Sequence, residues 1–304
     1  MKLRVNIFNT SSNLPLFAAV ANGFFAKRGL EIDIQNTPNS DEQRAGLAEG
    51  KFEMAHAAVD NAVAMIESGK DAVIVCGGDA GMNDFMVRAE INAMDDLRGK
   101  LLAVDAPNTA YALAAKKILQ LNGLIENRDY GVKLAGGTGP RSAAMVADPL
   151  LAAGMINPPF SFTVREKGLK SLGTQFDLLG PYQATGAFVM RPWADANADV
   201  LASYLAAYIE GQRHVLNPAN RAEMVALLAA RFNLSPAVAD GTYEAVVAPG
   251  SGLAPDAAFN NEGFATVLSI RAEMEGMWGG KPPKPQRYLD MSHYHKALAL
   301  TQSS

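Results

Sequence analysis

Apolar and polar positions alternate over the first residues of the chain. Leu3, Val5 and Ile7 are separated by polar residues, and this period of two predicts a half-buried strand over residues 2–8. A polar turn at residues 10–13 follows, and apolar residues then recur at helical spacing from Leu14 onward. Gly29 is predicted to end this helix. The chain therefore begins with a strand, a turn rich in hydroxyls and amides, and a helix.

The same order of elements recurs further along the sequence. Short apolar segments of strand character alternate with amphipathic segments of helical period, which predicts an α/β fold. In open sheets of this kind, small ligands bind beyond the carboxyl ends of the strands. Predicted strands cover residues 31–35, 52–55, 72–77, 85–88, 101–105 and 132–135, and the clearest predicted helices cover residues 40–48, 194–216 and 262–278.

Polar side chains gather where the predicted strands of the first half end. The turn at residues 10–13 precedes a helix, whose first turn has free N–H groups. His56 and Asp60 flank a strand-to-helix turn, where a histidine can bond a ligand oxygen or exchange protons. The same spacing also fits Asp60 as a partner of the helix dipole. The candidate ligand-binding residues of this half are Thr10, Ser11, Ser12, Asn13, His56, Asp60, Asn83 and Asp84.

Further candidates follow in the second half. Asn108 and Thr109 are predicted to begin a helix whose N–H groups suit a carboxylate, sulfonate or phosphate, although capping alone also explains them. Arg141 begins another helix, where a guanidinium can clamp an anion through two hydrogen bonds; an exposed arginine fits the pattern as well. Pro159 and Phe160 are predicted to form an apolar wall.

Composition narrows the class of ligand. A net charge of -4 over 304 residues gives no electrostatic reason to expect nucleic acid as a partner. The single cysteine, Cys76, excludes an intramolecular disulfide, and no set of His, Cys and carboxylate residues has metal-ligand spacing. No phosphate or dinucleotide fingerprint is present, so we expect no cofactor. No apolar run reaches the length of a membrane span.

Two segments carry a resemblance to a known family. NTSSNLPLFAAVANGFFAKRGLEIDI and AMDDLRGKLLAVDAPNTAYALAAKKIL resemble segments of the solute-binding proteins of ABC importers for nitrate, sulfonates, taurine and thiamine precursors, and of cytoplasmic enzymes on that fold. The resemblance implies a type II periplasmic-binding fold with two lobes, each with a mixed sheet flanked by helices, and a two-strand hinge. Lobe 1 is expected to comprise residues 1–88 and 183–304, and lobe 2 residues 89–182.

The resemblance leaves two functions open. In the first, the protein binds a small organic or oxoanionic solute, such as a sulfonate, carboxylate or pyrimidine-like compound, in a cleft between the lobes and passes it to an ABC permease. In the second, it is a lyase or decarboxylase acting on an aromatic or heteroaromatic acid, with His56 and either Asp60 or Asp84 as acid and base. The chemistry of the pyrimidine-precursor synthases is disfavoured. Those enzymes carry a lysine near the position of Ala57 or Ala58 and a cysteine-rich segment before the returning strand, and this sequence has neither.

The two functions imply different compartments. No charged-then-apolar leader precedes the first predicted strand. We therefore expect a periplasmic protein if a leader has been removed and a cytoplasmic protein otherwise.

Overall fold

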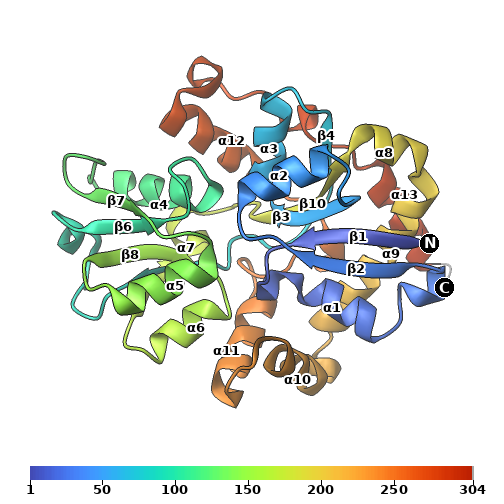
Figure 1. Cartoon of the computed structure of the whole chain (residues 1–304), viewed down its shortest axis with the longest axis horizontal. Coiled ribbons are helices and arrows are strands. Elements are labelled where there is room, and N and C mark those ends of the chain that lie inside the picture. Colours follow the sequence, from blue (N-terminus) through green and yellow to red (C-terminus); the bar gives the residue numbers. More distant parts are fainter. Residues whose placement is uncertain (303–304) are drawn as a thin grey trace.

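The chain folds into two lobes, each built on a five-stranded mixed sheet (Figure 1). This computed structural model describes residues 1–302. Lobe 1 holds the sheet β2-β1-β3-β10-β4, and lobe 2 holds the sheet β7-β6-β8-β5-β9. The strands are β1 (Lys2–Ile7), β2 (Glu31–Asn36), β3 (Met54–Ala58), β4 (Ala72–Gly77), β5 (Asp84–Val87), β6 (Leu101–Val104), β7 (Gly131–Leu134), β8 (Leu151–Ile156), β9 (Lys170–Thr174) and β10 (Thr185–Met190).

The chain passes from one lobe to the other twice, and the first strand after each of these crossings joins the sheet of the lobe that the chain has entered. β10 runs antiparallel to β3 and β4, and β5 runs antiparallel to β8 and β9, while β1 pairs in parallel with β2 and β3. The crossings are residues 78–83 and 180–184. Because β5 belongs to the sheet of lobe 2, the chain crosses before Asp84, earlier than the expected boundary between residues 88 and 89.

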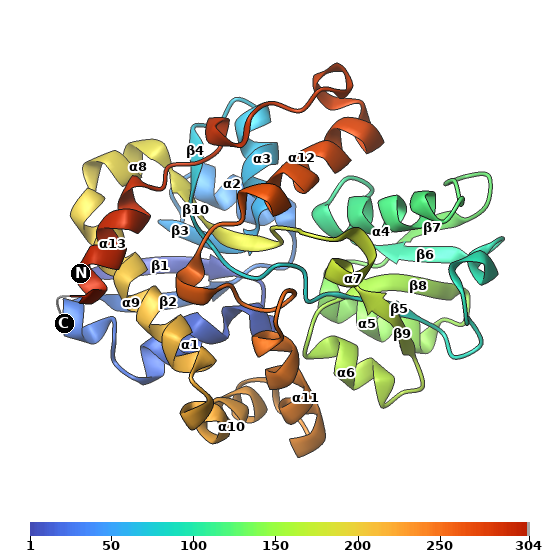
Figure 2. The same cartoon turned by 180° about the vertical axis from the view of Figure 1, so that it is seen from behind.

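Helices cover both faces of each sheet (Figures 1 and 2). In lobe 1, the core on one face includes residues of α1, α9 and α13, and the core on the other includes residues of α2, α3 and α12. The helices of lobe 1 are α1 (Leu14–Ala21), α2 (Ser40–Ala48), α3 (Val59–Glu67), α8 (Arg191–Ala196), α9 (Ala198–Leu216), α10 (Arg221–Phe232), α11 (Pro236–Val247), α12 (Asn261–Glu275) and α13 (Ser292–Gln302). Those of lobe 2 are α4 (Ala110–Leu121), α5 (Thr138–Ala147), α6 (Phe160–Arg165) and α7 (Gln175–Leu179).

Several element boundaries differ from the sequence-based expectation. α1 ends at Ala21, and a short 3-10 turn then leads to Gly29, whose φ of 69° is the left-handed conformation that glycine adopts without strain. β3 extends to Ala58 because His56 pairs with Ile7 on one side and Ala187 on the other. His56 therefore lies inside a strand and not after it. None of the helices within residues 1–302 has the length and apolar character that crossing a membrane requires.

Candidate functional site

A cavity lies between the two lobes, where the carboxyl ends of their parallel strands face each other. The volume that the centres of water molecules can occupy inside it is about 50 Å³. This is room for a few water molecules. The cavity therefore suits a compact ligand. Lobe 1 contributes Phe8, Thr10, Ser12, Asn13, Ser40, His56, Ala57, Ala58, Asn61 and Thr185, and lobe 2 contributes Asp105, Thr109, Ala110, Tyr111, Gly137, Thr138, Arg141 and Asn157.

Four helices begin at this cavity. The residues that precede α1, α3, α4 and α5 are Asn13, Ala58, Thr109 and Gly137, and all four line it. None of the four caps its helix with a side-chain hydrogen bond. The N–H groups of a first helical turn have no partner within the helix, and the helix dipole is positive there. The first N–H groups of α1 and α3 are bonded, that of Leu14 to the carbonyl oxygen of Ser11 and that of Val59 to that of Ala184 at 3.1 Å, but the positive ends of all four helix dipoles lie at the cavity.

Arg141 adds a buried positive charge to the lining. It is only 1% exposed. Its Nε and Nη2 donate to the carbonyl oxygen of Met155 at 3.1 and 2.9 Å, and Nη1 donates to that of Gly136 at 2.7 Å. Burial lowers the pKa of the guanidinium, and the Asp105 carboxylate, 3.9 Å from Nη1, opposes this shift. Three backbone hydrogen bonds thus fix the cation in one position at the cavity wall.

His56 is an uncharged member of the lining. Its Nε2 lies 2.8 Å from the hydroxyl of Tyr204, and its ring centroid lies 4.7 Å from that of Tyr208. Burial lowers the pKa of the imidazole to about 3, because the charged form loses its hydration. At neutral pH His56 therefore acts as a neutral hydrogen-bonding group.

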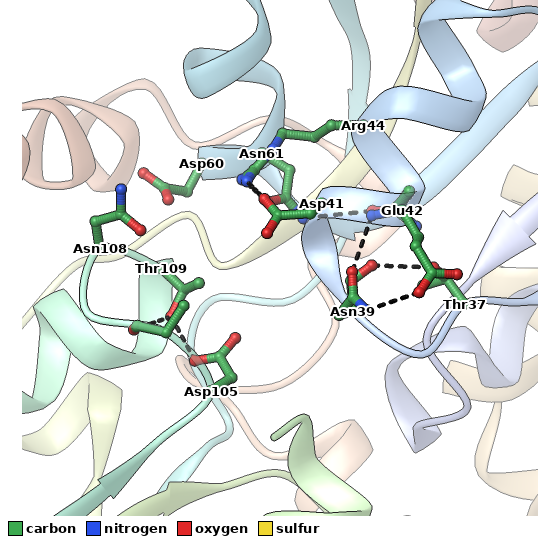
Figure 3. A network of polar contacts seen from close by, with 12 residues as sticks. Thr37, Asn39, Asp41, Glu42, Arg44, Asp60, Asn61, Asp105, Asn108 and Thr109 are labelled. Atoms are coloured by element: carbon green, nitrogen blue, oxygen red, sulfur yellow. Dashed lines mark hydrogen bonds and ion pairs between the residues drawn. The ribbon is translucent and has the colours of Figure 1, made fainter. Parts of the chain in front are cut away.

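Lobe 2 also supplies a linked set of neutral polar groups. Asn157 donates to the Tyr111 hydroxyl at 3.0 Å and accepts from the Thr138 hydroxyl at 2.9 Å. Burial raises the pKa of Tyr111 to about 12, so its hydroxyl stays protonated. Nearby, the Thr109 hydroxyl donates to Asp105, as Figure 3 shows. This bond explains why Thr109 does not cap α4.

Across the cavity, Asn61 of lobe 1 is fixed by its own neighbours. It accepts from Arg44 at 3.1 Å and donates to Gln43 at 3.3 Å, and Figure 3 shows Arg44 in turn bound to Asp41. The polar groups on both sides of the cavity are thus held by second partners.

The structure brings six of the predicted site residues together. Thr10, Ser12, Asn13, His56, Thr109 and Arg141 all line the cavity. Ser11 lies beside it, where its backbone N–H and hydroxyl both donate to the carbonyl oxygen of Pro158 in lobe 2, at 3.2 and 2.8 Å. Pro159 and Phe160 do not belong to the lining; they begin α6, and the predicted apolar wall is absent from the lining.

Four other predicted residues lie outside the lining, and the carboxylates among them are bound elsewhere. The carboxylate of Asp60 accepts from Arg271, whose Nη2 also donates to the carbonyl oxygen of Asn108 at 3.2 Å. Figure 3 shows Asp60 and Asn108 on facing elements. Asp84 accepts from Arg165 and Ser171, each at 2.7 Å, and Asn83 donates to Gln175 at 3.0 Å. Buried carboxylates are paired with cations in this way because the pairing offsets the loss of their hydration. Asp60 and Asp84 are therefore not free to contact a ligand in the cavity, contrary to what the sequence analysis expected.

The sequence analysis missed the other twelve lining residues, and three of these are polar groups at strand ends. Asp105 and Asn157 directly follow the carboxyl ends of β6 and β8, so applying the strand-end rule to every strand would have found them. Thr185 begins β10, which runs the opposite way, and only its pairing with Ala58 places it here. Within residues 1–302, no group of three or more His, Cys, Asp or Glu residues could hold a metal ion.

Comparison with known proteins agrees with this architecture. The nitrate-binding protein NrtA from Synechocystis PCC 6803 is 15% identical, with a TM-score of 0.79 over 100% of this chain and 89% of that chain. The alkanesulfonate-binding protein SsuA from Xanthomonas axonopodis pv. citri, bound to MOPS, is 19% identical, with a TM-score of 0.72 over 95% and 96%. The desulfurization enzyme DSZB is 14% identical, with a TM-score of 0.70 over 98% and 99%.

At these identities the likeness establishes the fold, which is the expected type II periplasmic-binding fold. No curated protein matches the chain. A family model described as NMT1/THI5 like matches residues 10–218, which is more than half of the sequence. The chain belongs to the NMT1/THI5-like family.

Proposed function

We propose that the protein binds a compact oxoanionic solute, with a sulfonate or carboxylate group, in the interlobe cavity and delivers it to an ABC-type permease. The observation that carries this proposal is the convergence of four helix N-termini, none with a side-chain cap, on one cavity. The nitrate- and alkanesulfonate-binding neighbours support it, since both bind oxoanions on this fold. On this proposal the protein works in the periplasm.

The charges of the lining support an anion over a neutral ligand. The carboxylate of Asp105 offsets the guanidinium of Arg141, and His56 is neutral. Each helix N-terminus then adds a partial positive charge of about half a unit. A neutral pyrimidine-like ligand would leave these helix N-termini without an anion. We therefore consider it a less suitable ligand than a sulfonate or a carboxylate. Asp105 remains as an acceptor for an N–H or O–H group of the same ligand.

Few polar contacts hold the lobes closed over the cavity. Besides the Ser11–Pro158 bonds, Arg271 of α12 donates to the carbonyl oxygen of Asn108 at 3.2 Å, Lys117 of α4 pairs with Glu273 of α12 at 2.6 Å, and Ser235 donates to Glu166 at 3.1 Å. These contacts join α4 and α6 of lobe 2 to lobe 1. A hinge motion at the two crossings would break them and open the cavity to solvent.

The residues expected to act as acid and base in the lyase alternative do not form a pair in the cavity lining. DSZB is an enzyme on the same fold, so the fold itself does not decide between binding and catalysis. A lyase needs a proton-transferring pair beside its substrate. His56 stays neutral down to a pH of about 3, and Asp60 and Asp84 bind arginines away from the cavity lining.

Isothermal titration calorimetry with nitrate, ethanesulfonate and propionate tests the proposal. At least one of these anions should bind the wild-type protein and raise its Tm. Ala58→Leu places a larger side chain in the cavity and should abolish binding, whereas the matched substitution at exposed Ala26, Ala26→Leu, should leave it unchanged. Failure of all three anions to bind, or wild-type affinity in Ala58→Leu, would refute the proposal.

A further inference from the structure

A small side pocket opens from the main cavity toward the interior of lobe 1. The two spaces share Ser12, Asn13, His56, Ala57 and Thr185, and Tyr208 of α9 lines only the side pocket. Its free volume, again measured for the centre of a water molecule, is about 10 Å³. One enclosed water needs about 10–15 Å³. The side pocket therefore has room for one small group.

Tyr208 points an unpartnered hydroxyl into this space. The residue is 2% exposed, and its hydroxyl oxygen has no hydrogen-bond partner within residues 1–302, yet it is not sealed among packed atoms as the partnerless hydroxyls of Ser161 and Thr242 are. Other buried tyrosine hydroxyls are bonded: that of neighbouring Tyr204 to His56, and that of Tyr243 on α11 to the carbonyl oxygen of Val215, at 3.1 Å. Buried hydroxyls are nearly always satisfied, so this hydroxyl is available to bond a group that enters the side pocket.

His56, which lines both the main cavity and the side pocket, has a second unpartnered atom. Its Nε2 is bonded to Tyr204, and its Nδ1 has no partner among the described residues. The other hydroxyls of the side pocket are engaged: that of Thr185 donates to Asp79 at 2.5 Å, and that of Ser12 bonds to Thr10 at 2.8 Å. Asn13 uses its amide N–H₂ on the carbonyl oxygen of Phe8 at 2.8 Å, so among the described residues of the side pocket the open capacity belongs to the Tyr208 hydroxyl, the His56 Nδ1 and the Asn13 side-chain oxygen.

We propose that the side pocket holds a hydroxyl group of the ligand, bonded by Tyr208 and His56, so that the protein prefers a hydroxylated sulfonate or carboxylate to its unsubstituted counterpart. This inference rests on the proposed function. A hydroxyl both donates and accepts, which satisfies Tyr208 and either tautomer of neutral His56. A methyl group would leave two buried polar atoms unpaired, and a charged group would lose its hydration without an ionic partner.

Calorimetry with two matched pairs of probes tests the inference: ethanesulfonate against 2-hydroxyethanesulfonate, and propionate against 3-hydroxypropionate. In the wild-type protein, the hydroxylated member of the binding pair should have an affinity about three- to tenfold higher, the worth of one buried hydrogen bond. Tyr208→Phe removes one oxygen and should bring this ratio close to one, while the affinity for the unsubstituted anion stays the same. Tyr243→Phe, which removes a buried hydroxyl elsewhere, should retain the wild-type ratio.

The outcomes separate this inference from the proposed function. Equal affinity for both members of a pair in the wild-type protein, or an unchanged ratio in Tyr208→Phe, would mean that the side pocket holds only an ordered water, and the inference would fall while anion binding stands. If neither pair binds, the proposed function fails and the inference fails with it. The wild-type comparison needs no variant, so equal affinity for both members of the binding pair refutes the inference even if Tyr208→Phe does not fold.

Discussion

The buried pair of Asp60 and Arg271 should stabilise the closed arrangement of the two lobes. The two side chains are only 4% and 5% exposed. Arg271 donates from Nε and Nη2 to the Asp60 carboxylate, from Nη1 to Glu275 at 3.0 Å, and from Nη2 to the carbonyl oxygen of Asn108. The pair thus links α3 and α12 of lobe 1 with the segment before α4 of lobe 2.

Asp60→Asn keeps the shape of the side chain and removes its charge. Removing one partner of a buried ion pair costs about 3–5 kcal/mol, because the remaining charge is left without compensation. Glu275 still accepts from Arg271 in this variant, so we expect a loss near the lower end, about 3 kcal/mol in the free energy of unfolding. Adding Arg271→Met should recover part of the lost stability, because the double variant no longer contains the unpaired guanidinium.

Urea unfolding at pH 7 measures this effect as a shift in the transition midpoint. Asp199→Asn is the matched control, because Asp199 is 90% exposed in its pair with Lys296 and exposed pairs contribute little. It should leave the midpoint unchanged. A midpoint for Asp60→Asn equal to that of the control would refute the reasoning, and so would a double variant that is less stable than Asp60→Asn alone.

Two further predictions concern stability. His56 has a folded-state pKa of about 3, below its ordinary 6.5. Its contribution to stability is therefore complete well above pH 6.5 and falls as the pH drops toward 3, by about 2 kcal/mol between pH 6.5 and 4.5. Urea titrations should show this loss in the wild-type protein and a smaller one in His56→Gln, and parallel curves would contradict the assignment. Gly77→Ala would place a Cβ 2.2 Å from the carbonyl oxygen of Ala258 and should cost about 1–3 kcal/mol in thermal unfolding, whereas Gly139→Ala, with its nearest contact at 3.5 Å, should be close to neutral.

The fold was largely predictable because its signals are local. The alternation at Leu3, Val5 and Ile7 predicts β1, and the polar first turn and apolar face of residues 40–48 predict α2 at the bounds that the structure has. Ends of elements were less predictable. Apolar spacing continues past Ala21, yet α1 ends there, and pairing with two neighbouring strands carries β3 through His56.

The site was predictable only in part, because a strand end reveals nearby polar groups but not what binds them. Thr10, Ser12, Asn13 and Thr109 were found from their turns and do line the cavity. Asp60 looked equally suitable in sequence, yet Arg271, 211 residues away, binds its carboxylate. Nothing near Asp60 in the sequence indicates that partner.

The sequence by itself determined the α/β class, the strand-turn-helix units and the helix starts that face a ligand, since these depend on periodicity and turn chemistry within a few residues. Only the tertiary structure decided which helix starts converge, which carboxylates are paired, and that Tyr208 on α9 reaches the space beside His56 on β3. Those outcomes depend on distances between segments far apart in the chain, and packing of the whole molecule sets such distances.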